Sequence, residues 1–188
     1  MDNNLWQAKS WIYEWNLEFA RKLELVRFMP WDEAMARGRA IDPEAVALMD
    51  REHTSAAYIP TFWAIALRDS SPDALRLAMI LVHEGTHAIE HLDGTFRPSM
   101  LGDPQVTVDI ENRAWTAEAK FASWFLAEHE VPENAPSSTT ELAGKLVFLL
   151  TTYGDIDVYD LGSGSGDFYE AVARKNARAI EDAHGWSR

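Results

Sequence analysis

One capped, apolar helix constrains the fold of this chain more than any other feature of its sequence. Residues 70 to 73, SSPD, supply an N-cap and a first-turn proline, and a mostly apolar run follows from Leu75 to Val82. The helix is predicted to continue to about His91 and to stop near Asp93-Gly94. An apolar run of this kind is typical of a buried helix.

The rest of the sequence predicts further helices and one short β element. Residues 57 to 68 are rich in aromatic and β-branched residues, but Pro60 interrupts them, so they are expected to form an edge strand. Helices are expected over residues 4–28, 31–37, 42–53, 108–129, 139–152 and 167–183, with a loop at 95–107 and a Pro-rich linker at 131–138. Strand and helix do not alternate as in a parallel sheet. We therefore expect an α+β fold that is predominantly helical.

Composition narrows the class of protein. The 188 residues suit a single domain spanning 1–188, and the formal net charge of -13 argues against nucleic acid or anionic lipid as a partner. There is no cysteine, so a metal would need histidine and carboxylate ligands. The sequence has neither a signal-like start nor an apolar run long enough for a membrane span, which predicts a soluble cytoplasmic protein.

Residues 83 to 87 read HEGTH, and on a helix this spacing of two histidines is suited to binding a metal ion. His83 and His87 are one turn apart on the same face, where two imidazoles can ligate one zinc ion. Glu84 lies beside them and can take a proton from a metal-activated water without ligating the metal. The alternative is a chance match that leaves a solvated histidine pair on the surface.

The third zinc ligand is expected on the helix that begins near residue 108. Glu111 is favoured and Glu118, seven residues later on the same face, is the alternative. Asp109 could orient a ligating histidine from outside the site, and His91 is either another such group or an ordinary helix C-terminal residue. A metzincin pattern is unsupported, because position 90 is glutamate where that pattern needs glycine.

HEGTH followed about two dozen residues later by E-x-x-A on a helix resembles the gluzincin group of zinc metallopeptidases. The closer likeness is to compact single-domain, minigluzincin-like putative metallopeptidases, over a core of about residues 57 to 125. Helices within 4–53 and 139–183 flank this core. The resemblance implies a zincin-like core, a substrate cleft lined by the edge strand, one zinc ion and hydrolysis of a peptide or protein substrate. It also implies His83, His87 and Glu111 as ligands and Glu84 as general base.

Two other functions remain open from the sequence. The thermolysin-like Asn-Glu-x-x-x-Asp form is absent, because Asn112 follows Glu111, and no residue is assigned to stabilise the transition state. Tyr153, Tyr159 and His129 are candidates only because they lie downstream. A catalytically silent zinc-binding domain with a regulatory or protein-interaction role is therefore the alternative. A di-iron carboxylate protein would need a second E-x-x-H motif, and the sequence has none.

Overall fold

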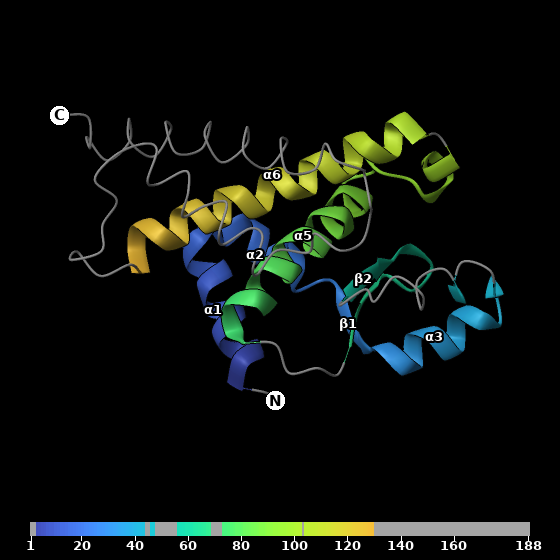
Figure 1. The fold of residues 1–188 in the computed structure, drawn as a ribbon, viewed down its shortest axis with the longest axis horizontal. Coiled ribbons are helices and arrows are strands. Elements are labelled where there is room, and N and C mark those ends of the chain that lie inside the picture. The colour runs from blue at the N-terminus through green and yellow to red at the C-terminus, as the bar shows by residue number, and fades with distance from the viewer. Residues whose placement is uncertain (1–2, 44–45, 48–55, 69–72, 103, 130–188) are drawn as a thin grey trace.

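The computed structural model describes residues 3–43, 46–47, 56–68, 73–102 and 104–129 (Figure 1). The described part is mostly helical and contains a small three-stranded sheet, which confirms the expected α+β class. In chain order the elements are α1 (Asn3–Trp15), α2 (Leu17–Leu23), β1 (Arg27–Pro30), α3 (Trp31–Arg39), β2 (Ala56–Ile59), the 3-10 helix η1 (Pro60–Phe62), β3 (Ala64–Leu67), α5 (Ala74–Leu92), the 3-10 helix η2 (Pro98–Gly102) and α6 (Pro104–His129).

The N-terminal segment is not the single helix expected over residues 4–28. Helix α1 ends at Trp15, and the Asn16 side chain accepts a hydrogen bond of 3.0 Å from the backbone N–H of Phe19, which caps a new helix, α2. Asparagine favours such caps because its side chain competes for backbone donors. The last residues of the expected helix form β1 instead, paired in parallel with the distant strand β3.

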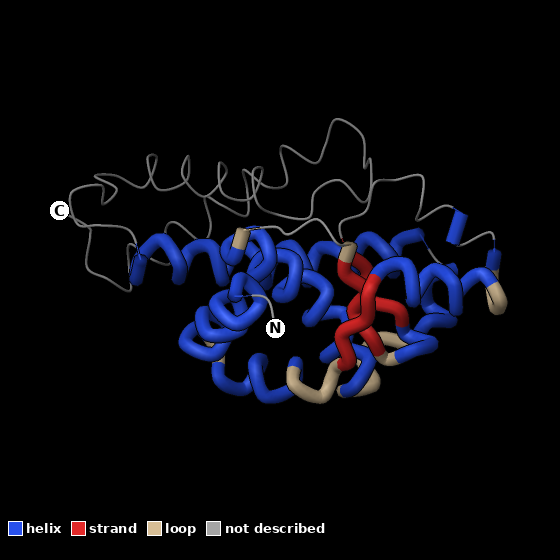
Figure 2. The backbone as a smooth tube through the Cα atoms, turned by 90° about the horizontal axis from the view of Figure 1, so that it is seen from below, coloured by secondary structure: helices blue, strands red, loops and turns tan. Residues whose placement is uncertain are grey.

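The β element also differs from the expected single edge strand at 57–68. Two strands, β2 and β3, form an antiparallel pair with Tyr58 opposite Ile65, and the sheet order is β1-β3-β2. Pro60 lies in the connection η1, where its missing N–H interrupts no ladder, so β2 alone of this pair lies at an edge. Figure 2 shows the three strands gathered in one place among the helices.

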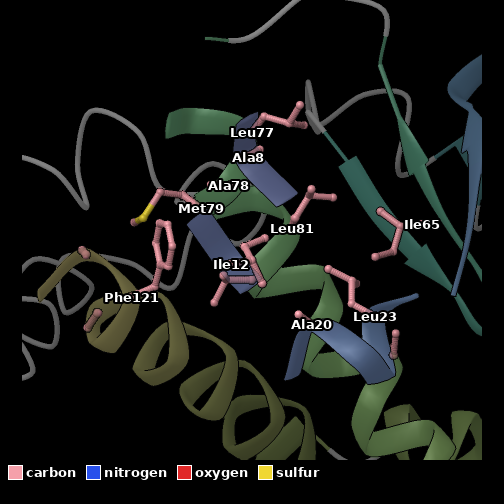
Figure 3. Close-up of a cluster of buried hydrophobic side chains, with 14 of the residues drawn as sticks. Ala8, Ile12, Ala20, Leu23, Ile65, Leu77, Ala78, Met79, Leu81 and Phe121 are labelled. Carbon is pink, nitrogen blue, oxygen red and sulfur yellow. The ribbon is translucent and has the colours of Figure 1, made fainter. Parts of the chain in front are cut away.

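The central helix α5 is confirmed, but it begins at Ala74 with Asp73 as its N-cap, so the expected first-turn proline is not part of it. Oδ1 of Asp73 accepts hydrogen bonds from the backbone N–H groups of Leu75 and Arg76, at 3.0 and 2.9 Å. The helix ends at Leu92, and Gly94 follows with a positive φ of 74°. Helix α5 packs against α1, α2, α6 and the strands β2 and β3, and Figure 3 shows the apolar side chains gathered between them.

Helix α6 is longer than expected, because it begins at Pro104 rather than at residue 108. It runs alongside α5 in Figure 1 and packs against it, and its buried residues include Ala114, Ala119 and Phe121. The predicted helix over 42–53 is described only in part, and the linker and helices predicted after residue 130 lie outside the described residues. Across the described ranges, no helix is long and apolar enough to cross a membrane.

Candidate metal centre

Helix α5 presents three polar side chains in its otherwise apolar buried stretch. His83, Glu84 and His87 are all buried, and the two histidines are separated by one turn. Buried ionisable groups are unfavourable unless they have partners, so their environment shows what the fold uses them for. The partners come from α6 and from the edge strand β2.

Glu111 of α6 completes a triangle of ligand atoms with the two histidines. Its Oε2 lies 3.2 Å from Nε2 of His83 and 3.5 Å from Nε2 of His87, and the two Nε2 atoms are 3.1 Å apart. All three residues are buried. Among the described residues they form the one group of three or more histidine or acidic side chains whose ligand atoms converge in this way.

The dimensions of this triangle fit a tetrahedral zinc ion. With metal–ligand bonds of about 2.0–2.1 Å, neighbouring ligand atoms of a tetrahedral site lie about 3.3 Å apart. The three observed separations, 3.1, 3.2 and 3.5 Å, fall on either side of that value. Two imidazole nitrogens and one carboxylate oxygen are also a usual donor set for catalytic zinc, which keeps a fourth position open.

The charges of the cluster also favour a bound cation. Burial works against a charged His83, but the carboxylates of Glu111 and Glu118 outweigh it and hold the pKa of His83 well above its ordinary value. Burial likewise works against an ionised Glu111, and hydrogen bonds with His83 and His87 nevertheless lower the pKa of Glu111 to about 2. The site therefore stabilises positive charge in a buried space, either a proton or a metal ion.

Glu118 occupies a different side of His83 from Glu111. Its carboxylate is completely buried, and its Oε2 lies 3.7 Å from Nδ1 of His83. The structure thus brings Glu111 to the two Nε2 atoms, while Glu118 faces the other ring nitrogen of one histidine. That is the position from which an outer carboxylate orients a ligating imidazole.

Glu84 faces the sheet. Its Oε2 accepts a hydrogen bond of 2.5 Å from the backbone N–H of Tyr58 on the edge strand β2. The sequence did not single out Tyr58, and the available signal was only its place in the strand candidate before α5. The contact ties the carboxylate expected to act as a base to the strand expected to line the cleft.

The two residues expected outside the ligand set have different surroundings. Asp109 has an exposed side chain, and its backbone carbonyl accepts a hydrogen bond from Arg113. His91 packs near the sheet, where its Nδ1 lies 2.8 Å from the hydroxyl of Tyr58 and its ring stacks on Trp63 at 4.2 Å between centroids. Neither residue is among the converging ligand atoms.

Of the candidates for stabilising a transition state, the structure describes His129, which lies far from the site. His129 ends α6, eighteen residues beyond Glu111, which corresponds to roughly 27 Å of helix. It stacks on Phe125 and lies 3.9 Å from Glu14 of α1. Tyr153 and Tyr159 lie outside the described residues.

Comparison with protein-family models, with curated proteins and with solved structures gave no match.

Proposed function

We propose that this chain is a zinc-dependent peptidase in which His83, His87 and Glu111 hold the metal and Glu84 is the general base. The observation that carries the proposal is the buried triangle of two Nε2 atoms and one carboxylate oxygen with sides of 3.1, 3.2 and 3.5 Å. A proton on one imidazole satisfies only part of that triangle, whereas a metal ion engages all three atoms.

The surrounding fold supports a zincin-like core over residues 57 to 125. The edge strand β2 is antiparallel to its neighbour and packs against α5, the helix that carries the HEGTH segment. Helix α6, which packs on the same helix, supplies Glu111. This arrangement agrees with the gluzincin resemblance of the motif, and strand β2 lies at an edge of the described sheet, where it contacts Glu84.

Each residue of the centre has a defined task in this proposal. When bound, zinc supplies Lewis-acid chemistry that makes water a competent nucleophile near neutral pH. The backbone N–H of Tyr58 holds Oε2 of Glu84, which leaves Oε1 to accept the proton of the attacking water. Glu84 then delivers that proton to the leaving amine, and Glu118 keeps the His83 ring in position from its Nδ1 side.

A catalytically silent zinc-binding domain is the second candidate. It is favoured by the same contact between Glu84 and Tyr58, because a carboxylate already bonded to its own chain is less available to a substrate. Both candidate functions include a bound zinc ion, but only the peptidase would hydrolyse peptide bonds.

Metal content and cleavage test the two steps separately. Protein purified without chelators should contain about one zinc per chain by elemental mass spectrometry, and His83→Ala/His87→Ala should contain none. Glu84→Gln should keep the zinc and lose cleavage of a peptide library, while the exposed control Glu24→Gln should keep both. Zinc without any cleavage by the wild type would favour the silent domain, and absence of zinc from the wild type would overturn both.

A further inference from the structure

Trp63 displays an aromatic ring from a strained backbone position in the connection between β2 and β3. It follows η1 with φ 50° and ψ 45°, and its side chain is 47% exposed. A left-handed conformation is unfavourable for a residue with a large side chain, and such strain is concentrated at functional sites. Two backbone hydrogen bonds hold it, from the Trp63 N–H to Pro60 and from Arg27 to the Trp63 carbonyl, both at 3.2 Å.

The Trp63 ring packs on His91, and His91 in turn contacts Tyr58. The Trp63 ring is stacked on His91, with 4.2 Å between centroids and an interplanar angle of 11°. The Tyr58 hydroxyl lies 2.8 Å from Nδ1 of His91, and burial raises the pKa of Tyr58 to about 12, so the hydroxyl keeps its proton. We call Tyr58, Trp63 and His91 the aromatic shelf. One face of Trp63 is covered by His91, and its exposed area is available to a second planar group.

The aromatic shelf and the proposed base, Glu84, involve different parts of α5. Tyr58 spans both places, since its N–H bonds to Glu84 and its hydroxyl to His91. Glu84 and His91 are seven residues apart on α5, which is about 10 Å along the helix. The shelf and the proposed base therefore lie at two separate places along α5, and Tyr58 contacts both.

The direction of the peptide follows from the sheet. The edge strand β2 runs from Ala56 to Ile59, toward the turn that carries Trp63. A peptide added to this edge in the slightly more stable antiparallel pairing runs the opposite way. Its N-terminal residues then lie at the Trp63 end.

We propose that the aromatic shelf is a specificity subsite that stacks a planar side chain on the N-terminal side of the cleaved bond. This inference rests on the proposed peptidase function and names its substrate class, a peptide with arginine or an aromatic residue at that position. Tryptophan is the best aromatic partner for a cation, and the net charge of -13 attracts basic peptides, so arginine is the stronger of the two.

Peptide binding to the Glu84→Gln protein tests the shelf without requiring hydrolysis. The probes are fluorescein-labelled nonapeptides of glycine and serine with one arginine, phenylalanine, leucine or aspartate, measured by fluorescence anisotropy. Arginine and phenylalanine peptides should bind roughly two- to five-fold more tightly than leucine and aspartate peptides, as expected for stacking at a half-exposed site. Equal affinities, or no binding of any peptide, would overturn the proposal.

Variants of Trp63 assign the effect to its ring. Trp63→Gly removes the ring and accepts the left-handed backbone without strain, so it should abolish the preference. Trp63→Tyr should restore part of it. Trp6→Ala removes another exposed tryptophan, on α1, and should leave the preference unchanged. A preference that persists in Trp63→Gly, or that is lost in Trp6→Ala, would contradict the assignment.

Mapping of cleavage sites shows whether the subsite proposal or the peptidase proposal is wrong. In a random peptide library, wild-type cleavage sites should be enriched in arginine and phenylalanine at one fixed position before the cut, and Trp63→Gly should lose the enrichment while keeping its zinc. Cleavage without that enrichment would overturn the shelf and leave the peptidase intact. Selective binding without cleavage would overturn the peptidase and leave the shelf as a peptide site.

Discussion

Oε2 of Glu118 lies 3.7 Å from Nδ1 of His83, while Oε2 of Glu111 lies 3.2 Å from Nε2 of the same ring. One imidazole is thus flanked by two buried carboxylates, one near each ring nitrogen. A carboxylate at Nδ1 favours the tautomer that carries its proton there, which leaves Nε2 free to bind a metal. This relationship separates a proposed ligand from a proposed orienting group on the same helix.

Glu118→Gln should therefore weaken zinc binding without removing the site. Loss of an outer carboxylate of this kind typically lowers metal affinity by about 10- to 100-fold. Competition with a chromophoric chelator measures the change, and Glu111→Gln should have a larger effect because it removes a ligand. Equal affinities of Glu118→Gln and wild type would show that Glu118 does not orient His83.

The metal-free protein should be most stable in a mildly acidic window. The raised pKa of His83 stabilises the folded state. This contribution to the free energy of unfolding has its full size below pH 6.5, the pKa of an unfolded histidine, and it is lost as pH rises through the pKa of His83 in the folded protein. The lowered pKa of Glu111 also stabilises the folded state. Its contribution has its full size above pH 4.5, the pKa of an unfolded glutamate, and it is lost as pH falls through about 2, the pKa of Glu111 in the folded protein. Both contributions are complete between about pH 4.5 and 6.5.

Urea unfolding of chelator-treated protein at pH 5.5 and pH 8.5 measures this dependence. The wild type should have the larger free energy of unfolding at pH 5.5, and the difference should shrink in Glu111→Gln, which cannot form the charged pair. A wild type that is more stable at pH 8.5, or an unchanged difference in the variant, would contradict the assignment.

Asp73→Ala should destabilise α5 through the loss of its N-cap. Oδ1 of Asp73 serves two backbone N–H groups, and replacing such a cap with alanine typically costs about 1 kcal/mol. For a chain of this size that lowers the Tm by roughly 2–4 °C. Asp73→Asn keeps a capping oxygen and should unfold close to the wild type in the same thermal melt, so an equal loss in both variants would rule out the cap as the cause.

Gly85→Ala should destabilise the packing of α5 against α2. A Cβ at this position would lie 3.0 Å from Cδ1 of Leu23 and 3.0 Å from Cζ of Phe19. Overpacking of a core costs about 1–3 kcal/mol, against a gain of about 1 kcal/mol from the better helix former. We expect a net loss of about 1 kcal/mol in urea unfolding. Lys120→Ala, at an exposed position of α6, should be neutral, and a stabilised Gly85→Ala would show that the two side chains yield freely.

Local signals predicted α5 and the relative positions of its polar residues. The cap at Asp73 and the run of apolar residues are properties of a short stretch of chain, and the one-turn spacing of His83 and His87 follows from helical geometry alone. Position within one helix is therefore accessible from sequence. The sequence does not decide between Glu111 and Glu118 in the same way, because the two residues share a face of α6. Only the packing of α6 on α5 decides which of them meets Nε2 of His83.

Nonlocal pairing explains the errors in the sheet and in the N-terminal segment. Residues 27 to 30 continue a helical pattern of apolar residues, yet they form β1 because β3, more than thirty residues later, offers a strand edge. Tyr58 was missed for a related reason. Its backbone N–H reaches Glu84 from another element, and no residue type in the sequence signals a contact made by the main chain.

The ligand atoms of the proposed metal centre come from two helices that are consecutive in the chain apart from the short 3-10 segment η2. His83 and Glu111 are 28 residues apart, so bringing them together closes only a modest loop, whose entropy cost grows slowly with length. The sheet, by contrast, needs β1 to find β3 across a longer stretch. During synthesis the proposed donor set is therefore complete as soon as Glu111 has emerged, and an ion captured by the two helices would join α5 to α6 and add its binding energy to their folding while the rest of the chain is still being made.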